Sequence, residues 1–303
     1  MSAGEFIRSE DAFRSLITAD GSTPFGVESG RYHLYVSLAC PWASRAVIVR
    51  LLKGLESAVG LTVLDPIRDE RGWAFRTGPG YTTDPINGFA FLREAYLASD
   101  PAYRGGVTVP VLWDKKLHRI VNNSEDDICR MFNGVLAGLG RGGPELFPPE
   151  LEAEHTQLAS DIYANINNGV YRAGFARTQA AYAGACRGVF AALDRMERRL
   201  ATRRYLFGRP IVEADWRLFC TLIRFDPVYH GHFKCNLRHI LDYENLQNYL
   251  LDLYQLPGIA DTVNFDHIKR HYYFTHHDIN PTRIVPLGPI LDLARPHGRE
   301  RLG

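Results

Sequence analysis

The sequence lacks a surplus of charge, because 35 lysines and arginines almost cancel 34 aspartates and glutamates and leave a formal net charge of +1. Without a strong field of one sign we expect neither nucleic acid nor an anionic membrane as a partner. Its apolar runs fall far short of the ~20 residues of a membrane-spanning helix. The opening stretch MSAGEFIRSEDAF has no basic region followed by an apolar core, as a signal peptide would. These absences predict a soluble, cytoplasmic protein.

Cysteine is also scarce, and no two cysteines stand at CxxC spacing. The absence of CxxC spacing argues against a structural zinc site and against a dithiol redox centre. The histidines are not spaced with carboxylates as a metal cage, so we expect no metal. In a reducing compartment each cysteine is by default a buried free thiol that packs as a small apolar side chain. The five cysteines are Cys40, Cys129, Cys186, Cys220 and Cys235.

The chain of 303 residues is long enough for two domains, and 46% of its residues are hydrophobic. Residues 1–30 are polar and predict an irregular N-terminal extension. Residues 31–140 read as strand, helix, strand, an unassigned segment, two strands and a helix, which predicts a small α/β domain. A linker rich in glycine and proline over 140–150 leads to residues 150–265, where apolar residues recur at helical spacing. Residues 266–303 predict a C-terminal extension that packs on the surface.

Cys40 stands where a strand pattern gives way to a helix pattern. The run YHLYVSLA favours a strand, and Pro41 suits the first turn of the helix that follows. A thiol at a helix N-terminus meets unpaired N–H groups and the positive end of the helix dipole, which favour the reactive thiolate. Ala43 stands where a resolving cysteine would be, so a monothiol mechanism with an external thiol is favoured. The alternative for Cys40 is a buried structural thiol.

Two helix starts are predicted from local sequence. Ser124 is a candidate N-cap, with Asp127 three residues later in a pattern similar to a capping box. Val212 precedes another helix, with Asp215 at its third helical position. A valine cannot supply the side-chain cap that threonine supplies, which costs ~1 kcal/mol.

The order of these parts, an α/β domain with a cysteine at its first helix and then an all-helical domain, resembles that of the glutathione transferase superfamily. The segment SLACPWASRAVIVRLLKGLE resembles the active-site motif of the glutathionyl-hydroquinone reductases, also called Xi-class glutathione transferases. Further blocks of similarity follow in the same order, between about Tyr32 and Pro289. They are GWAF, VTVPVLWDKK, IVNN, RMFN, IYANINNGVYRAGFA, EADWRLFCTLIRFDPVY, HFKCN, HIKRHYY and INP.

The resemblance implies a thioredoxin-like N-terminal domain that binds glutathione, a helical C-terminal domain and a homodimer. It also implies an activity, in which glutathione reduces a glutathionyl-hydroquinone to the free hydroquinone and is released as glutathione disulfide. Cys40 would be the catalytic nucleophile and would form a mixed disulfide with glutathione. An omega-like thiol transferase or dehydroascorbate reductase shares this cysteine chemistry. A non-catalytic binding protein that keeps the fold is a further alternative.

The resemblance also assigns residues to the glutathione site. Trp73 matches a tryptophan that lines it, and Val109 and Pro110 match a cis-proline turn whose backbone meets the cysteinyl unit. The alternative for Pro110 is a proline in an edge strand. Ser124 and Glu125 match the pair that holds the γ-glutamyl end, in reversed order. That order leaves open glutathione or another low-molecular-weight thiol as the co-substrate.

Tyr171 and Tyr272 match two tyrosines that face the active cysteine, and the resemblance makes both catalytic and substrate-binding. A phenol can donate a hydrogen bond to the departing hydroquinone oxygen and so improve the leaving group. Tyr273 is the substrate-binding alternative if the register is off by one. Taken alone, each tyrosine has the simpler interpretation of a packed aromatic residue with a satisfied hydroxyl.

Overall fold

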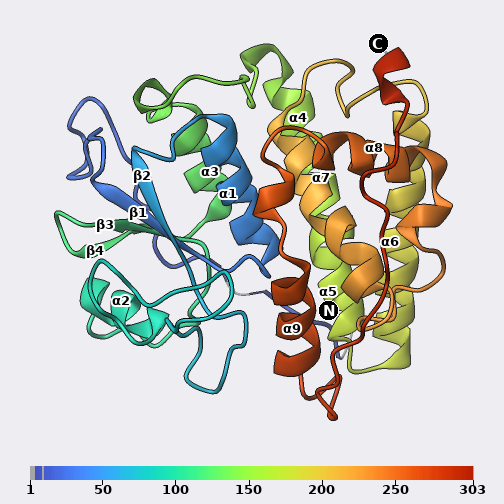
Figure 1. Ribbon diagram of the computed structural model, residues 1–303, viewed down its shortest axis with the longest axis horizontal. Helices are drawn as coiled ribbons and strands as arrows, with labels where there is room; N and C mark the ends of the chain where they lie inside the picture. Colours follow the sequence, from blue (N-terminus) through green and yellow to red (C-terminus); the bar gives the residue numbers. More distant parts are fainter. Residues whose placement is uncertain (1–3, 9, 303) are drawn as a thin grey trace. The chain divides into compact units, whose positions relative to one another are not determined.

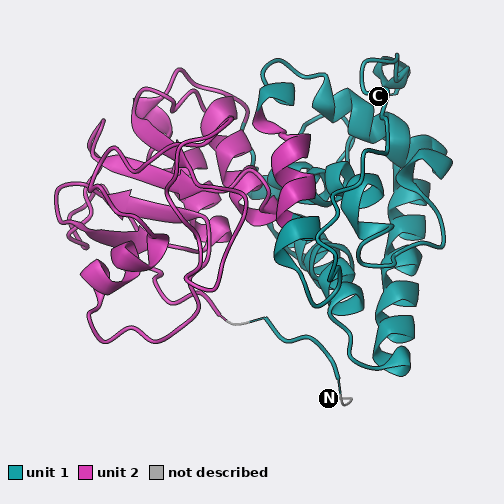
Figure 2. Cartoon of the chain, turned by 60° about the horizontal axis from the view of Figure 1, so that its bottom comes forward, with its two compact units in different colours: residues 1–8, 145–261, 272–303 teal, residues 9–144, 262–271 magenta. Residues whose placement is uncertain are grey.

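The computed structural model describes residues 4–8 and 10–302. The chain divides into two compact units, each assembled from segments that are separate in sequence (Figure 2). Unit 2 comprises residues 9–144 and 262–271, and unit 1 comprises the remainder of the chain. One boundary between the units lies after Pro144, within the segment 140–150. Residues 262–271 cluster with the α/β unit, whereas we expected 262–265 at the end of the helical domain and 266–271 in the C-terminal extension.

Unit 2 is built on a four-stranded sheet with the strand order β2-β1-β3-β4 (Figure 1). The central strand β1 (Tyr32–Val36) pairs in parallel with β2 (Val59–Val63) and antiparallel with β3 (Val111–Asp114). The edge strand β4 (Arg119–Asn122) pairs antiparallel with β3. Every residue of β1 is buried, as expected for a central strand covered on both faces. This mixed sheet is the thioredoxin-like arrangement that the resemblance implied.

Among the described residues, three α-helices belong to the α/β part of unit 2. Helix α1 (Pro41–Leu52) starts at the predicted proline and is followed by Gly54, whose φ of +64° a glycine adopts without strain. Helix α2 (Leu92–Ser99) lies in the segment that the sequence left unassigned. Helix α3 (Glu125–Asn133) follows β4 and packs against α1.

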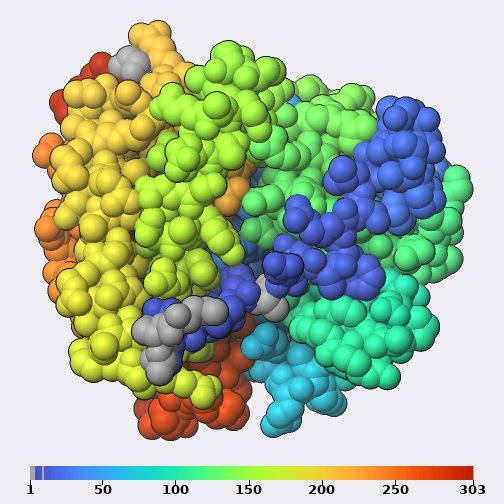
Figure 3. All heavy atoms as spheres, turned by 180° about the vertical axis from the view of Figure 1, so that it is seen from behind, coloured from blue at the N-terminus to red at the C-terminus, as the bar shows by residue number. Residues whose placement is uncertain are grey.

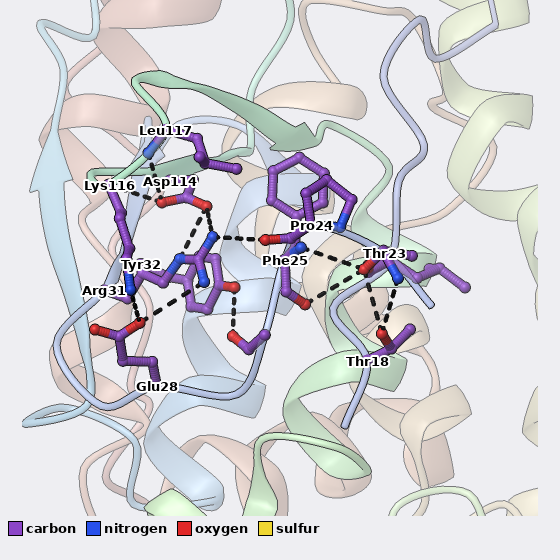
Figure 4. A network of polar contacts seen from close by, with 12 residues as sticks. Thr18, Thr23, Pro24, Phe25, Glu28, Arg31, Tyr32, Asp114, Lys116 and Leu117 are labelled. Carbon is purple, nitrogen blue, oxygen red and sulfur yellow. Dashed lines mark hydrogen bonds and ion pairs between the residues drawn. The ribbon is translucent and has the colours of Figure 1, made fainter. Parts of the chain in front are cut away.

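The N-terminal segment of unit 2 is irregular, as predicted, but it is tied to the sheet by a buried ion pair (Figure 4). Arg31 donates from Nε and Nη2 to Oδ2 of Asp114, over 2.9 and 2.5 Å, and from Nη2 to the Pro24 carbonyl over 2.9 Å. The Tyr32 hydroxyl donates to the Gly26 carbonyl over 2.6 Å. Charge-assisted bonds of this kind fix the loop against β1 and β3.

Further towards the N-terminus the same segment covers strand β4. In Figure 3 its dark blue residues lie against green residues of the same unit. The backbone of Phe13 exchanges hydrogen bonds with Asn123, and the Ser15 N–H donates to the Val121 carbonyl over 3.1 Å. Arg14 lies 2.7 Å from a carboxylate oxygen of Asp127. These contacts occupy a sheet edge that would otherwise offer unpaired backbone groups.

Unit 1 is helical, as the apolar spacing predicted (Figure 1). Two π-helical turns interrupt it, η3 (Tyr163–Asn167) between the first two helices and η4 (Phe225–Tyr229) after α7. Such turns widen a helix locally and redirect its side chains, and they occur often at functional sites. The helices of this unit before the C-terminal segment are α4 (Glu152–Ile162), α5 (Asn168–Gly174), α6 (Gln179–Leu200), α7 (Glu213–Arg224) and α8 (Glu244–Tyr254).

The start of α7 is held by a carboxylate. Val212 supplies no side-chain cap, as predicted, but Asp215 accepts hydrogen bonds from the backbone N–H groups of Val212 and Leu206, each over 2.9 Å. The Tyr249 hydroxyl donates to the same carboxylate over 2.8 Å. Asp215 is fully buried, so these bonds replace all of its hydration.

The C-terminal segment contains a helix that the sequence analysis did not predict. Helix α9 (Phe265–Thr275) occupies the first part of 266–303, where we expected a surface extension. Its Ile268 and Tyr272 are buried, so this stretch contributes to the hydrophobic core and is not the surface extension that we expected. The boundary between the two units passes along α9, between His271 and Tyr272. Within the part of the chain that the structure describes, no helix is both long and apolar enough to span a membrane.

Candidate active site

Cys40 occupies the position that its sequence predicted. It is the last extended residue before α1, with φ −78° and ψ 121°, and Pro41 begins the helix. Its thiol is partly exposed, whereas the other four cysteines, all described by the structure, are buried. Accessibility and a helix N-terminus together are the conditions under which a cysteine becomes a nucleophile. Cys40 is thus the cysteine in this chain that is placed to react.

The backbone opposite Cys40 comes from the turn before β3. The thiol Sγ of Cys40 lies 3.6 Å from the carbonyl oxygen of Val109. The bond from Val109 to Pro110 is cis, as the resemblance implied. Pro110 precedes β3, which lies inside the sheet between β1 and β4, so the edge-strand alternative is wrong. The turn therefore brings backbone groups to the thiol, at the place expected for the cysteinyl unit of glutathione.

Trp73 is nearly buried in unit 2, with 5% of its surface exposed. Its ring stacks on the imidazole of His271, with 5.0 Å between ring centroids and 14° between planes. His271 is itself fixed by a hydrogen bond of 2.7 Å between Nδ1 and the Pro66 carbonyl. Trp73 is therefore held in place by His271 of α9, and the sequence did not indicate that these two residues are in contact.

Ser124 lies directly before α3, where its backbone N–H donates to Oδ1 of Asn122 over 2.7 Å. The predicted capping box is wrong, because the Ser124 side chain makes no capping bond. Asp11 of the N-terminal segment interacts with the Ser124 side chain, which lowers the pKa of Asp11, although burial has the larger effect and raises it. Asp127 binds Arg14 and Asn122 instead of closing the box. The N-terminal segment thus engages the side chains of Ser124 and Asp127, the two residues that were expected to cap α3.

Glu125 begins α3 and faces α1. Its Oε1 lies 3.0 Å from Nη2 of Arg45, and Arg45 also contacts Asp126. Burial raises the pKa of Glu125 to about 7, and the positive charge of Arg45 opposes that rise. A carboxyl group that titrates near neutrality can exist in either protonation state while the protein works.

This raised pKa predicts a pH-dependent stability. Folding favours the protonated form of Glu125, so its contribution is present below the ordinary pKa of 4.5 and is lost as the pH rises through about 7. Glu125→Gln removes the titration. We expect the unfolding free energy of the variant, relative to the unmodified protein, to rise by about 2 kcal/mol between about pH 5 and about pH 8. Denaturant titration at both pH values measures it.

The matched control is Glu70→Gln, which removes an exposed carboxylate from the same unit. That variant measures the effect of the substitution itself at a carboxylate that is exposed to water. A constant difference between Glu125→Gln and the unmodified protein over the same range would contradict the raised pKa.

The tyrosines from α5 and α9 meet in unit 1. The hydroxyl oxygens of Tyr171 and Tyr272 are 2.5 Å apart although the residues are 101 positions apart in sequence. The Tyr273 hydroxyl instead donates to the Pro227 carbonyl over 3.2 Å. The register that pairs Tyr171 with Tyr272 is therefore the one that the fold adopts.

A third tyrosine joins this pair. The hydroxyl of Tyr229, at the end of η4, lies 2.9 Å from that of Tyr272. Tyr229 lies inside a sequence block that carried the resemblance, but nothing in its spacing indicated a role. Only the packing of α7, η4 and α9 brings it to the other two. We refer to Tyr171, Tyr272 and Tyr229 as the tyrosine chain.

Residues 4–8 contribute to the surroundings of Tyr171. The Arg8 guanidinium lies 4.8 Å from the centre of the Tyr171 ring, and its Nε donates to Asn168 over 3.1 Å. The Phe6 ring stacks on Phe175 with 5.3 Å between centroids. The environment of Tyr171 is thus aromatic and positively charged, which suits an electron-rich aromatic ring as ligand.

No group of three or more histidine, cysteine, aspartate or glutamate side chains among the described residues is arranged to hold a metal ion. The chemistry that the described site residues offer is that of a thiol, backbone carbonyl and amide groups, and phenol hydroxyls.

A thioredoxin-like sheet with an accessible cysteine at its first helix, followed by a helical unit, defines a glutathione transferase. Residues 39–134 match the family model of the glutathione S-transferase N-terminal domain, and residues 179–251 match that of the C-terminal domain. The chain belongs to the glutathionyl-hydroquinone reductases, the Xi class of these transferases.

Three relatives support this assignment. Glutathionyl-hydroquinone reductase YqjG of Escherichia coli K12 is 51% identical over 98% of this chain and 93% of its own. Its glutathione-bound structure has a TM-score of 0.93 and covers 95% of this chain and 96% of that one. Glutathionyl-hydroquinone reductase PcpF of Sphingobium chlorophenolicum is 45% identical, with coverage of 95% and 91%. The Xi-class structure from Natrialba magadii is 47% identical, with a TM-score of 0.94 and coverage of 96% and 89%.

Proposed function

We propose that this protein reduces glutathionyl-hydroquinones to hydroquinones with glutathione as the co-substrate. The observation that carries the proposal is an accessible thiol at a helix N-terminus, facing a backbone carbonyl of a cis-proline turn, in a chain that is 51% identical to YqjG. YqjG is a glutathionyl-hydroquinone reductase by name, and its structure holds glutathione.

The reaction proceeds by two thiol exchanges. In the first, the Cys40 thiolate attacks the sulfur of the glutathionyl-hydroquinone. A sulfur–sulfur bond forms, the carbon–sulfur bond breaks, and its electron pair stays with the hydroquinone fragment, which takes up a proton. In the second, a glutathione thiol gives up its proton and attacks the mixed disulfide on Cys40. Glutathione disulfide leaves and the Cys40 thiolate is restored.

The other assigned residues of unit 2 bind glutathione. Val109 and Pro110 present backbone groups to the cysteinyl unit, and Trp73 lines the same site. Ser124 and Glu125 hold the γ-glutamyl end, with Glu125 as the carboxylate that meets its ammonium group.

The tyrosines act on the hydroquinone. Tyr171 and Tyr272 bind it and donate to a hydroquinone oxygen as the fragment departs from sulfur, which is the role of a general acid. The hydroxyl of Tyr273 is committed to Pro227, so we assign it no direct part in the chemistry.

We further propose that residues 31–140 form the glutathione-binding domain and residues 150–265 the helical domain, in a cytoplasmic homodimer. Five free cysteines suit a reducing compartment, where glutathione is also available. The homodimer follows from family membership, and the mass of the protein in solution tests it.

Mass spectrometry of the protein after incubation with a glutathionyl-hydroquinone tests the proposed function. We expect the added mass of one glutathione, on the peptide that contains Cys40 and on no other cysteine peptide, together with free hydroquinone. Further glutathione should remove the adduct and release glutathione disulfide. Adduct formation with a small disulfide but not with the hydroquinone conjugate would favour an omega-like thiol transferase and overturn the proposal.

A further inference from the structure

Asp11 lies in the irregular N-terminal segment of unit 2, and neither the sequence analysis nor the resemblance gave it a role. We propose that the Asp11 carboxylate, together with Glu125, accepts hydrogen bonds from the γ-glutamyl ammonium group of the glutathionyl substrate. The inference rests on the proposed function and deepens it, because it adds a binding residue from the N-terminal segment to the glutathione site.

The backbone brings Asp11 to the start of α3. The Phe13 N–H donates to the Asn123 side-chain oxygen over 2.8 Å, and the Asn123 N–H donates to the Phe13 carbonyl over 2.9 Å. The two segments run antiparallel here, with Arg14 opposite Asn122. Because antiparallel partners proceed in opposite directions, the residues before Phe13 lie beside the residues that follow Asn123. Asp11 is thereby placed at the first turn of α3.

The side chain of Asp11 meets the residue directly before this turn. Asp11 interacts with the side chain of Ser124, which precedes α3. Since the residues that match the family's γ-glutamyl pair stand in reversed order, position 124 carries a hydroxyl group and not a carboxylate. Asp11 therefore brings a carboxylate from another segment to the position where the reversed order has removed one.

Glu125 shares its carboxylate with a cation of the protein. Its Oε1 lies 3.0 Å from Nη2 of Arg45, and this ion pair is almost fully buried. An ammonium group has three N–H donors, so it is bound best where acceptors reach it from more than one residue. A second carboxylate on the N-terminal segment adds acceptors to those that Glu125 divides between Arg45 and the ligand.

The charges around Asp11 favour a bound cation. Burial has the largest effect on its carboxyl group and raises the pKa. Arg14 and the Ser124 side chain lower this pKa, whereas the negative charges of Asp126 and Asp127 raise it. An ammonium group beside Asp11 would favour the charged carboxylate and would replace its lost hydration by charge-assisted hydrogen bonds.

A purely structural role for Asp11, as a tie between the N-terminal segment and α3, makes a different prediction. Removing the ammonium group from the substrate separates the two roles. Deamino-glutathione carries a glutaryl unit in place of the γ-glutamyl unit and keeps the thiol, the peptide bonds and both carboxylates. Conjugates of one hydroquinone with these two thiols therefore differ only in the group that Asp11 is proposed to bind.

The test is Asp11→Asn, with hydroquinone release in the first exchange measured by rapid quench for each conjugate. The concentration of the glutathione conjugate that half-saturates this exchange should rise by about 10-fold, the effect of losing one charge-assisted hydrogen bond. The limiting rate should stay unchanged, because the ammonium group is bound alike before and during bond breaking. The unmodified protein should bind the deamino conjugate more weakly, and Asp11→Asn should weaken that binding no further.

Equal weakening of both conjugates, or unchanged binding of the glutathione conjugate, overturns the inference. The matched control is Asp127→Asn, which loosens the same segment by removing a carboxylate 2.7 Å from the Arg14 guanidinium. This variant should affect the two conjugates alike, and discrimination as large as that of Asp11→Asn would contradict the assignment. If the unmodified protein forms no mixed disulfide with the glutathione conjugate, the proposed function itself fails, and the inference fails with it.

Discussion

Replacing Cys40 by alanine should abolish turnover of a glutathionyl-hydroquinone, with a loss on the order of 10⁴-fold or more, because the substitution removes the nucleophile itself. The side chain is partly exposed, and its thiol lies 3.6 Å from the Val109 carbonyl oxygen. Its loss therefore leaves the packing almost unchanged, and the variant should fold normally. Hydroquinone release, followed by chromatography, measures the activity, and circular dichroism checks the fold.

The control for this experiment is Cys186→Ala, at a buried thiol on α6 in unit 1. This variant should keep its rate, because Cys186 takes no part in the proposed reaction, although it should lose some stability. Substantial reductase activity in Cys40→Ala would show that another group carries the glutathione, and the proposed mechanism would be wrong.

Replacing Asp215 by alanine should cause the largest loss of stability among the changes considered. The substitution leaves two buried backbone N–H groups, of Val212 and Leu206, without their shared acceptor. The Tyr249 hydroxyl loses its 2.8 Å bond and keeps only the 3.3 Å bond to the backbone carbonyl of residue 215. Each unsatisfied buried group costs about 1–3 kcal/mol, so we expect the free energy of unfolding to fall by about 3 kcal/mol or more. Denaturant titration monitored by tryptophan fluorescence measures the change.

Asp242 offers a matched control, because its carboxylate accepts from the His239 backbone N–H over 2.9 Å at the start of a short helix but is exposed to water. Asp242→Ala should cost only about 1 kcal/mol, the usual value for an exposed helix cap. Equal losses in the two variants would mean that the burial of Asp215 contributes nothing.

The features that the sequence predicted correctly are local ones. The strand before Cys40, the helix from Pro41 and the turn between β3 and β4 follow from apolar spacing, proline and turn residues within a few positions of each other. The cis bond at Val109–Pro110 came from a resemblance over a short block. Such features survive folding because the hydrogen bonds and backbone preferences that cause them are themselves local.

The predictions that were wrong or missing depended on distant partners. Ser124 and Asp127 have the spacing of a capping box, yet the N-terminal segment occupies both side chains. Helix α9 was missed because its sequence is polar and histidine-rich, and its burial depends on where it packs. Its His271 stacks on Trp73, a partner almost 200 residues away in sequence.

By itself, the sequence determined that Cys40 stands at a helix start with no resolving cysteine beside it, because both facts concern neighbours along the chain. Only the tertiary structure decided which hydroxyls join Tyr171. The 101 residues from Tyr171 to Tyr272 and the 43 from Tyr229 to Tyr272 carry no periodicity that links them. Packing around a buried cluster brings the three hydroxyls together, and burial requires that they bond to one another.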